Sequence, residues 1–486
     1  MPSADEQWPQ SAGRPSLERA ADVGAGASHS GEGCWSLLDL TAPTRSQVLH
    51  CLVGDFLCYS GANEVNLQLY AVRSVCKELH EQVDEECLTF NYDDDCGLRE
   101  DPVEEIQLVN QLVKRHGRLK YFECSFKHPS RLKALLKHLE LPQGALCSFA
   151  FEVKTGAEPI RKLLERFHVR RLSIIPEHGG PDGSQEWIPK KPAHLRTLCL
   201  RGCTQEIAKA FISASPKLQG LQLIDSRLAS LEDTGLHGAG LTSLTLTGVV
   251  TMPDEQFSRV IAACQNLRSL YISKCHVSNI TVALPRLQVL SVTHCRQLTD
   301  QCATELLQPT NNPALRYLDL TEDRGLVSPS FAHPGVEVAW LMHCPQLTDQ
   351  ALSKMFQSCL SLTAVNLVQS GIQRAFICSS TLKTLELTTS QHLADSCVTQ
   401  LLEHCPSLVF LDVGHCCNLY EPTLAHATLE SIFLSFCVNL KEHAIAHMFE
   451  NCGSLKYVEL AVCMFDMTRF QMEYKDRVQV VVNFDF

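Results

Sequence analysis

Residues 408–440, LVFLDVGHCCNLYEPTLAHATLESIFLSFCVNL, contain one apolar frame twice. The copies start at Leu408 and Leu429, and each has the form LxxLxLxxC with an apolar residue at every L. The alternation in the middle of the frame predicts a short β-strand that buries one face. One such strand cannot bury its own face, so the repetition predicts a stack of coils that share a core.

The same frame occurs throughout the C-terminal three quarters of the chain. Clear copies begin at Leu195, Leu267, Leu287, Val336, Leu408, Leu429 and Leu455, and weaker ones at Leu119, Leu146, Val169, Leu218, Leu241, Leu315, Leu362 and Leu382. From Val336 onward the starts are spaced alternately by 26, 20, 26, 21 and 26 residues. We therefore expect long and short coils to alternate over residues 119–486.

The long units have room for a helix after the strand. In PQLTDQALSKMFQSC, Thr348 and Asp349 offer N-cap chemistry, and Leu352, Met355 and Phe356 form an apolar stripe at helical spacing. The short units have room only for a turn or loop. The predicted fold class is α/β: a solenoid with a curved parallel sheet, convex helices and loops, and a closing strand in the C-terminal RVQVVVNFDF.

The residues before the repeats differ in character. Residues 1–33 are rich in Ala, Gly, Ser and Pro and predict a disordered tail. Residues 34–90 carry apolar residues at helical spacing and predict a small helical segment, and residues 91–118 connect it to the solenoid.

The composition limits the kind of partner and compartment. A formal net charge of −12 argues against nucleic acid as a partner. Neither a signal peptide nor a run of about 18 apolar residues occurs, so we expect no membrane association and a cytoplasmic or nuclear location. The 24 cysteines in a long chain without an export signal then predict reduced, packed thiols rather than disulfides.

The cysteines and histidines follow the repeat, which predicts structural roles. His294, His343 and His415 precede a frame Cys and could form a metal or pH-sensing column. Turn or rim roles are favoured, because the same register is interrupted by Glu322, Gln369 and Thr389. Phosphate-loop, HExxH and GxSxG motifs are missing from the sequence. We expect no metal site, no cofactor and no enzymatic activity; the alternative is an enzyme that uses the vicinal pair Cys416 and Cys417.

Without a catalytic motif, we expect function to lie in binding on the exposed strand face. The residues of this face are the third, fifth and seventh of each frame. Aromatic residues supply contact area, and carboxylates favour a protein substrate with a basic segment. The candidate substrate-binding residues are Tyr271, Asp319, Trp340, Glu386, Phe410, Asp412, Phe433, Tyr457 and Glu459, with Trp340 and Phe433 as the main contacts. The alternative is that the acidic residues only keep the sheet soluble and the aromatic residues pack against one another.

The segments HCPQLTDQALSKMFQSCLSLTAVNL and EHCPSLVFLDVGHCCNL resemble the cysteine-containing leucine-rich repeat, CPxLxxLxLxxCxxLTDxxL. The likeness covers roughly residues 119–486 and implies the same solenoid fold. Proteins of this repeat type often carry an N-terminal F-box, which docks on the Skp adaptor of a cullin-RING ubiquitin ligase.

Residues 40–90 are similar to an F-box. The likeness lies in Val48, Leu49 and Leu52 for a first helix and in Leu69, Val72, Val75, Cys76 and Lys77 for the portion that contains VCK. The resemblance implies that a Skp-type adaptor binds here and connects the chain to a cullin ligase core. The adaptor-binding residues would be Val48, Leu49, Leu52, Leu69, Val72, Val75 and Cys76. The chain would then be the substrate-recognition subunit of an SCF-type ligase, with the target protein on the concave repeat face. The alternatives are a helical cap over the first coil and a repeat scaffold without a ligase role.

Overall fold

The computed structural model describes residues 89–93, 103, 106–107, 110–111, 121–126, 129–141, 145–176, 194–228, 230 and 240–482. The described strands form one sheet of 17 parallel strands. Their bounds are β1 Thr89–Asp93, β2 Tyr121–Phe126, β3 Leu146–Thr155, β4 His168–Pro176, β5 Thr197–Arg201, β6 Gly220–Ile224, β7 Ser243–Thr247, β8 Ser269–Ser273, β9 Val289–Thr293, β10 Tyr317–Asp319, β11 Val338–Trp340, β12 Ala364–Asn366, β13 Thr384–Glu386, β14 Phe410–Asp412, β15 Ser431–Phe433, β16 Tyr457–Glu459 and β17 Gln479–Val481. The helices are α6 Pro129–His138, α7 Ala157–Arg166, α8 Gln205–Ser213, α9 Asp254–Ala262, α10 Asp300–Leu306, α11 Asp349–Ser358, α12 Asp395–His404, α13 Glu442–Asn451 and α14 Met467–Glu473.

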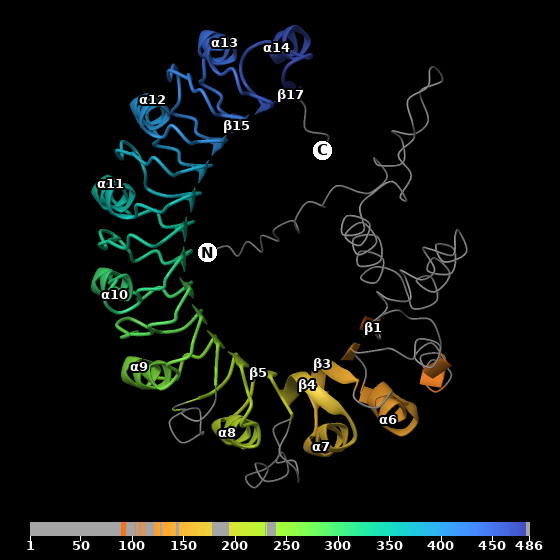
Figure 1. The fold of residues 1–486 in the computed structure, drawn as a ribbon. Coiled ribbons are helices and arrows are strands. Elements are labelled where there is room, and N and C mark those ends of the chain that lie inside the picture. The colour runs from red at the N-terminus through yellow and green to blue at the C-terminus, as the bar shows by residue number, and fades with distance from the viewer. Residues whose placement is uncertain are drawn as a thin grey trace, which may run out of the picture.

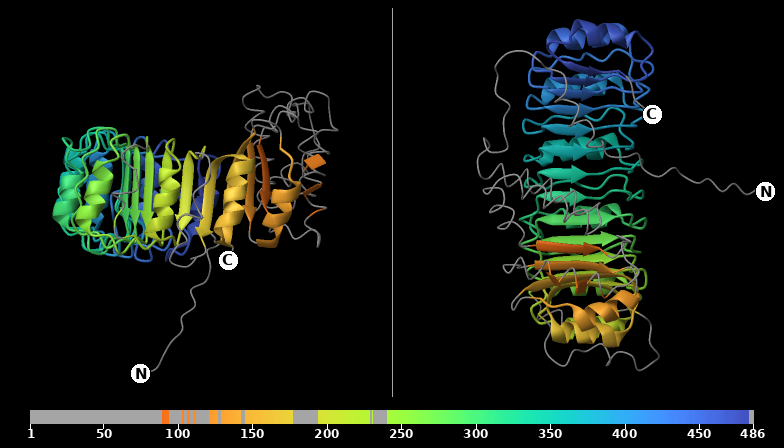
Figure 2. Two further views of the ribbon diagram at one scale, coloured as in Figure 1. Left: turned by 90° about the horizontal axis from the view of Figure 1, so that it is seen from below. Right: turned by 90° about the vertical axis from the view of Figure 1, so that its right-hand side faces the viewer.

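The strands line the inner side of a wide arc, and the helices lie on its outer side (Figure 1). The right-hand view of Figure 2 shows the strands from green to blue stacked one above another, each paired with its neighbours in the chain. This arrangement confirms the predicted α/β leucine-rich-repeat solenoid, with a concave strand face and a convex helical face.

The core consists of the frame residues that the sequence predicts to be buried. In the coil of β14, Leu408, Leu411, Val413 and Cys416 are all 0% exposed, whereas Phe410 is half-buried on the concave side. Each buried leucine stabilises the fold by about 1.5–3 kcal/mol before ordering costs. Neighbouring coils supply the two sides of this core, which is why the frame repeats.

Long and short coils alternate as their spacing predicts. Helices α9, α10, α11, α12 and α13 follow β7, β9, β11, β13 and β15, while β8, β10, β12 and β14 lead into turns. In α11 the Thr348 hydroxyl accepts a hydrogen bond from the Ala351 N–H at 3.3 Å, and Leu352, Met355 and Phe356 are buried. The predicted cap and stripe of this helix are therefore confirmed.

Asp349 does not cap its own helix; its carboxylate binds the next coil. The two oxygens accept the backbone N–H groups of Gln373 and Arg374, each at 2.9 Å, and the Ser353 hydroxyl accepts that of Phe376 at 2.8 Å. The same pairs of acceptors, an Asp and a hydroxyl one turn later, occur in α9, α10 and α12 as Asp254 with Ser258, Asp300 with Thr304, and Asp395 with Thr399. Each helix thus holds the following helix-free coil, so the repeating unit is a pair of coils.

A left-handed residue ends every strand from β5 to β16, at the eighth position of the frame. These residues are Gly202, Asp225, Gly248, Lys274, His294, Glu322, His343, Gln369, Thr389, His415, Phe436 and Val462, with φ between 48° and 67°. In this series the N–H groups from Gly202 to Phe436 bind the next coil, as the His343 N–H does with the Val368 carbonyl at 2.8 Å. Most of these residues are not glycine, so the regular inter-coil bonds offset the cost of a positive φ.

The frame cysteine, at the ninth position, also connects coils. The thiols of Cys344, Cys416 and Cys437 donate to the carbonyls of Leu320, Leu387 and Val413 in the preceding coil, at 3.2, 3.4 and 3.1 Å. Burial raises the pKa of the Cys416 thiol to about 12, so this thiol stays protonated as the donor. Packed thiols are the role that the sequence predicts for these positions.

The N-terminal coils differ from the regular frame. Strand β1 starts at Thr89, so the described sheet includes a strand before residue 119; its Phe90 lies opposite Phe122 of β2. Phe122 in turn pairs with Cys147, which places β2 and β3 two residues away from the register that frames starting at Leu119 and Leu146 would give. Aromatic residues alternate with polar ones in TFNYD, which favours a strand there.

The two ends of the solenoid are described to different extents. The last strand, β17, pairs in parallel with β16 and lies within the predicted closing segment. The predicted tail, residues 1–33, and residues 34–88 of the F-box-like segment lie outside the described residues. No helix in the described part of the chain is both long and apolar enough to cross a membrane.

Candidate functional site on the concave face

All nine predicted substrate-binding residues lie on the concave strand face, at the third or fifth frame position. Trp340 is 42% exposed and Tyr271 is 37% exposed, and the other seven are half-buried. Large aromatic side chains this open to solvent are uncommon on a sheet interior and mark binding surfaces when they group together. Their grouping therefore decides how the face can be used.

The aromatic side chains form two groups. On β10 and β11, Tyr317 and Trp340 meet edge to face with ring centroids 5.4 Å apart. On β14, β15 and β16, Phe410, Phe433 and Tyr457 form a continuous row with centroids 5.2 Å apart at both steps. The aromatic side chains thus pack against one another, as the alternative interpretation expects. Trp340 nevertheless remains exposed to solvent on the concave side.

Tyr271 lies apart from both groups. It is on β8, where its register partner on β9 is Ser291, and Ser291 in turn faces Asp319 on β10. The Ser291 hydroxyl donates to Asp319 Oδ2 at 3.1 Å. Tyr271 is therefore two strands away from the first aromatic group, on a stretch of the face with small hydroxyl side chains.

Three of the polar residues in the fifth position bind their own backbone. The side-chain oxygens of Asp319, Asn366 and Asp412 accept the N–H groups two residues on, at 3.0, 3.1 and 2.8 Å. Glu459 accepts the Ser435 hydroxyl at 2.7 Å. These hydrogen bonds explain why polar residues occur at these positions without a partner protein.

Glu386 is the exception in this row. Its Oε2 accepts from the Asn366 side-chain amide, and Asp412 lies directly opposite it on the next strand. Burial and the Asp412 carboxylate raise the pKa of Glu386. Two carboxylates on adjacent strands repel each other, and a cation from a partner would relieve that repulsion.

We define the central segment of the concave face as Ala364, Asn366, Thr384, Glu386 and Asp412. It lies on β12, β13 and β14, between Trp340 on one side and the row that begins at Phe410 on the other. Its side chains are small or polar, whereas both borders are aromatic. A partner can therefore place apolar groups at the borders and a basic group in the middle.

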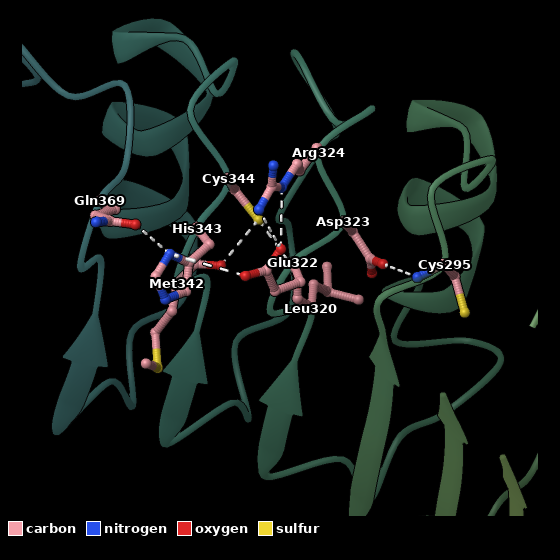
Figure 3. A network of polar contacts seen from close by, with 9 residues as sticks. All are labelled: Cys295, Leu320, Glu322, Asp323, Arg324, Met342, His343, Cys344 and Gln369. Atoms are coloured by element: carbon pink, nitrogen blue, oxygen red, sulfur yellow. Dashed lines mark hydrogen bonds and ion pairs between the residues drawn. The ribbon is translucent and has the colours of Figure 1, made fainter. Parts of the chain in front are cut away.

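The three repeat histidines His294, His343 and His415 are left-handed residues in the turns that follow the strands, and Figure 3 shows His343 in this position. His343 binds the Gln369 side chain through Nδ1, and the same nitrogen is 3.9 Å from Glu322, which pairs with Arg324 at 2.9 Å. His415 stacks instead on Phe436 with centroids 4.2 Å apart. These rings thus lie in the predicted turn positions, each with its own neighbours.

Asp323 is a residue that the sequence analysis does not single out. It takes the place of the frame cysteine in its coil, is 0% exposed, and accepts the Cys295 N–H through Oδ1 at 2.6 Å (Figure 3). Within the described part of the chain its Oδ2 has no hydrogen-bond partner. Burial raises the pKa of Asp323 to about 9, and nearby Asp319 adds to the rise. The sequence signal is one acidic residue at a frame position that otherwise holds Cys, Ser or Val249 in the coils from β5 to β16.

The chain has little sequence similarity to known proteins. No family model and no curated protein matches it. A chain of the yeast Rad7–Elc1 complex is 18% identical, covers 75% of this chain and 90% of its own, and gives a TM-score of 0.40. A leucine-rich-repeat protein of Leptospira interrogans is 14% identical, covers 76% and 91%, and gives 0.41.

A third solved structure, the octameric complex of Latrophilin 3, Unc5D and FLRT2, contains a chain that is 14% identical. It covers 71% of this chain and 86% of its own, with a TM-score of 0.28. At such identities and TM-scores these likenesses say nothing about partners or activity. The fold assignment depends on the repeat and strand register of this chain itself.

Proposed function

We propose that the chain binds a partner protein on its concave face, with Trp340 and the row of Phe410, Phe433 and Tyr457 as the main contacts. The observation that carries this proposal is the exposed indole of Trp340, held in place by Tyr317 beside a carboxylate-bearing segment. Buried aromatic anchors provide most of the energy in protein interfaces. The net charge of −12 and the pair of Glu386 and Asp412 favour a partner with a basic segment.

A photo-crosslinking amino acid introduced at position 384 tests the face directly, because Thr384 is half-buried on β13, between Trp340 and Phe410, and is not one of the proposed main contacts. The full chain with the crosslinker in place of Thr384 should capture its partner, and the chain with the crosslinker in place of Glu403 should not. Glu403 is the matched control because it is exposed on α12, on the convex side. Equal capture at both positions, or capture at Glu403 alone, would refute concave-face binding.

We further propose that the bound partner is a substrate of a cullin-RING ubiquitin ligase. The support is the resemblance of residues 40–90 to an F-box, including Leu69, Val72 and Val75. Docking through that segment would raise the local concentration of the partner near the catalytic module of the ligase. A repeat scaffold without a ligase role is the competing proposal.

Co-purification of a Skp-type adaptor with the full chain distinguishes the two proposals. The adaptor should bind the wild type and be lost from the Leu69→Asp, Val72→Asp double variant, while the variant keeps its concave-face partner. The partner should then be ubiquitinated only with the wild-type chain. If the adaptor fails to bind the wild type, the scaffold proposal holds.

We propose that the chain itself makes or breaks no covalent bond in a substrate. In support, Cys416 of the vicinal pair is fully buried, and a protonated thiol is a poor nucleophile. Its neighbour Cys417 is exposed. Partner binding and ubiquitination should therefore persist after Ser replaces both residues, and their loss in a folded variant would point to an enzyme.

A further inference from the structure

The spacing of the contact groups on the concave face limits the sequence of the segment that can bind there. Trp340 is on β11 and Phe410 is on β14, so three inter-strand steps separate them. At about 4.8 Å per step, the two aromatic borders lie about 14 Å apart along the sheet. The acceptor Glu386 lies between them, on β13.

An extended chain that crosses the strands matches this distance. Its side chains point to one face at every second residue, and it rises about 3.3 Å per residue, so residues i and i+4 are about 13 Å apart. Residue i then faces Trp340, residue i+4 faces Phe410, and residue i+2 faces the central segment. Residues i+1 and i+3 point away from the sheet.

The central residue meets two carboxylates and an aromatic ring. Glu386 and Asp412 are register partners, so their carboxylates are one strand apart. Phe410 is two residues before Asp412 on the same strand and on the same face. A guanidinium can donate to both carboxylates at once and lie against the ring, whereas an ammonium presents a compact charge.

We infer that the partner presents an extended segment of the form apolar-x-Arg-x-apolar, with the arginine at Glu386 and Asp412 and the apolar residues at Trp340 and Phe410. This inference rests on the proposed binding role of the concave face and adds the identity and spacing of the recognised side chains. Arginine is preferred to lysine, and a neutral residue at the centre leaves the two carboxylates unrelieved.

Labelled peptides and the full chain test the pattern by fluorescence anisotropy. The reference peptide contains Leu-Ser-Arg-Ser-Phe within a Gly-Ser flank. Three others replace Arg by Lys, replace Arg by Gln, or add one Ser on each side of Arg. We expect the Gln peptide and the lengthened peptide to bind at least about tenfold more weakly than the reference peptide, a factor that corresponds to the loss of one charged contact. The affinity of the Lys peptide should lie between those of the reference and Gln peptides.

Protein variants assign the contacts. Glu386→Gln should remove most of the preference for Arg over Gln, while Trp340→Ala should weaken both peptides by a similar factor. Glu403→Gln, the same substitution on the convex side of the same coil, should change neither. Three results would overturn the inference. The Arg and Gln peptides could bind equally well, the lengthened peptide could bind as well as the reference peptide, or none of the peptides could bind.

This outcome is separable from failure of the proposed function. If the partner still crosslinks at position 384 but none of the peptides binds selectively, the concave face is the binding site and only the segment pattern is wrong. If crosslinking at position 384 also fails, the binding role itself is wrong.

Discussion

The carboxyl group of Asp323 accepts a hydrogen bond from the backbone N–H of Cys295 at 2.6 Å, inside the core of the solenoid. From β5 to β16, the equivalent positions in the other coils hold Cys, Ser or, in one coil, Val249, and all of these side chains are neutral. Because burial raises the pKa of Asp323 to about 9, the carboxyl is protonated in the folded protein at neutral pH and ionised in the unfolded chain.

The Asp323→Asn variant should therefore have a different pH dependence of stability from the wild type. The folded wild type holds a proton that the unfolded chain releases above pH about 4, so its stability falls as pH rises toward about 9. Relative to the wild type, the free energy of unfolding of the variant should rise by up to about 1.4 kcal/mol per pH unit in this window.

Urea denaturation at several pH values across this window measures that difference. Asp225→Asn is the matched control, because Asp225 is exposed at the turn edge of another coil. The pH-dependent change should be larger for Asp323→Asn than for this control. A flat difference between Asp323→Asn and the wild type would mean that the carboxyl is ionised in the folded protein.

Ser390→Cys should stabilise the protein. Ser390 is 0% exposed at the frame cysteine position, and its hydroxyl has no hydrogen-bond partner in the described part of the chain. A thiol has a longer bond to Cβ and reaches the carbonyl of the preceding coil, as the Cys416 thiol does at 3.4 Å. We expect a gain of about 1 kcal/mol in the free energy of unfolding under reducing conditions.

The reverse change, Cys437→Ser, provides the comparison. It replaces a thiol that donates to the Val413 carbonyl at 3.1 Å by a shorter hydroxyl in a buried site. We expect a loss of about 1–3 kcal/mol, because a buried polar group is left unpaired. If both substitutions are neutral, thiol length does not matter at this position.

The sequence predicts the core because one spacing rule applies to every coil from β4 to β16. The residues predicted to be buried around Leu411 are buried, and Phe410 and Asp412 face the concave side as the alternation requires. The predicted alternation of helical and helix-free coils also appears, because the number of residues between frames limits what can form there. The periodicity of the sequence thus predicts most of the fold.

Contacts between coils are outside what local patterns predict. The sequence gives Asp349 the role of a helix cap, whereas its partners are Gln373 and Arg374 in the next coil. Likewise, nothing in the residue type of His343 predicts a positive φ, because its conformation depends on an N–H bond to the neighbouring coil. The contact between Trp340 and Tyr317 depends on register and rotamer, which spacing alone does not determine.

Replacing Asp349 should loosen the pairing of two coils. Asp349→Ala removes the acceptors of two backbone N–H groups, and Ser353→Ala removes the acceptor of one. We expect losses of about 1–3 kcal/mol for the first and about 0.5–1.5 kcal/mol for the second. Gln350→Ala, an exposed neighbour in the same helical turn, should stay within about 0.5 kcal/mol of the wild type.

Amide hydrogen exchange locates this effect. The N–H groups of Gln373 and Arg374 should exchange faster in Asp349→Ala, whereas that of Phe376 should respond chiefly to Ser353→Ala. Unchanged protection of all three would show that the carboxylate is dispensable for holding the helix-free coil.

Leu411→Ala tests whether the frame leucines are shared between coils. Leu411 is 0% exposed on β14, with Leu385 and Ile432 as its register partners on the two neighbouring strands. Truncation leaves a cavity bounded by three coils, so the free energy of unfolding should fall by about 2–5 kcal/mol. Lys383→Ala, at an exposed site one coil earlier, should change it by less than about 0.5 kcal/mol. Equal effects of the two substitutions in urea denaturation would contradict a core that adjacent coils share, because only such a core makes the leucine costlier to remove than a solvated lysine.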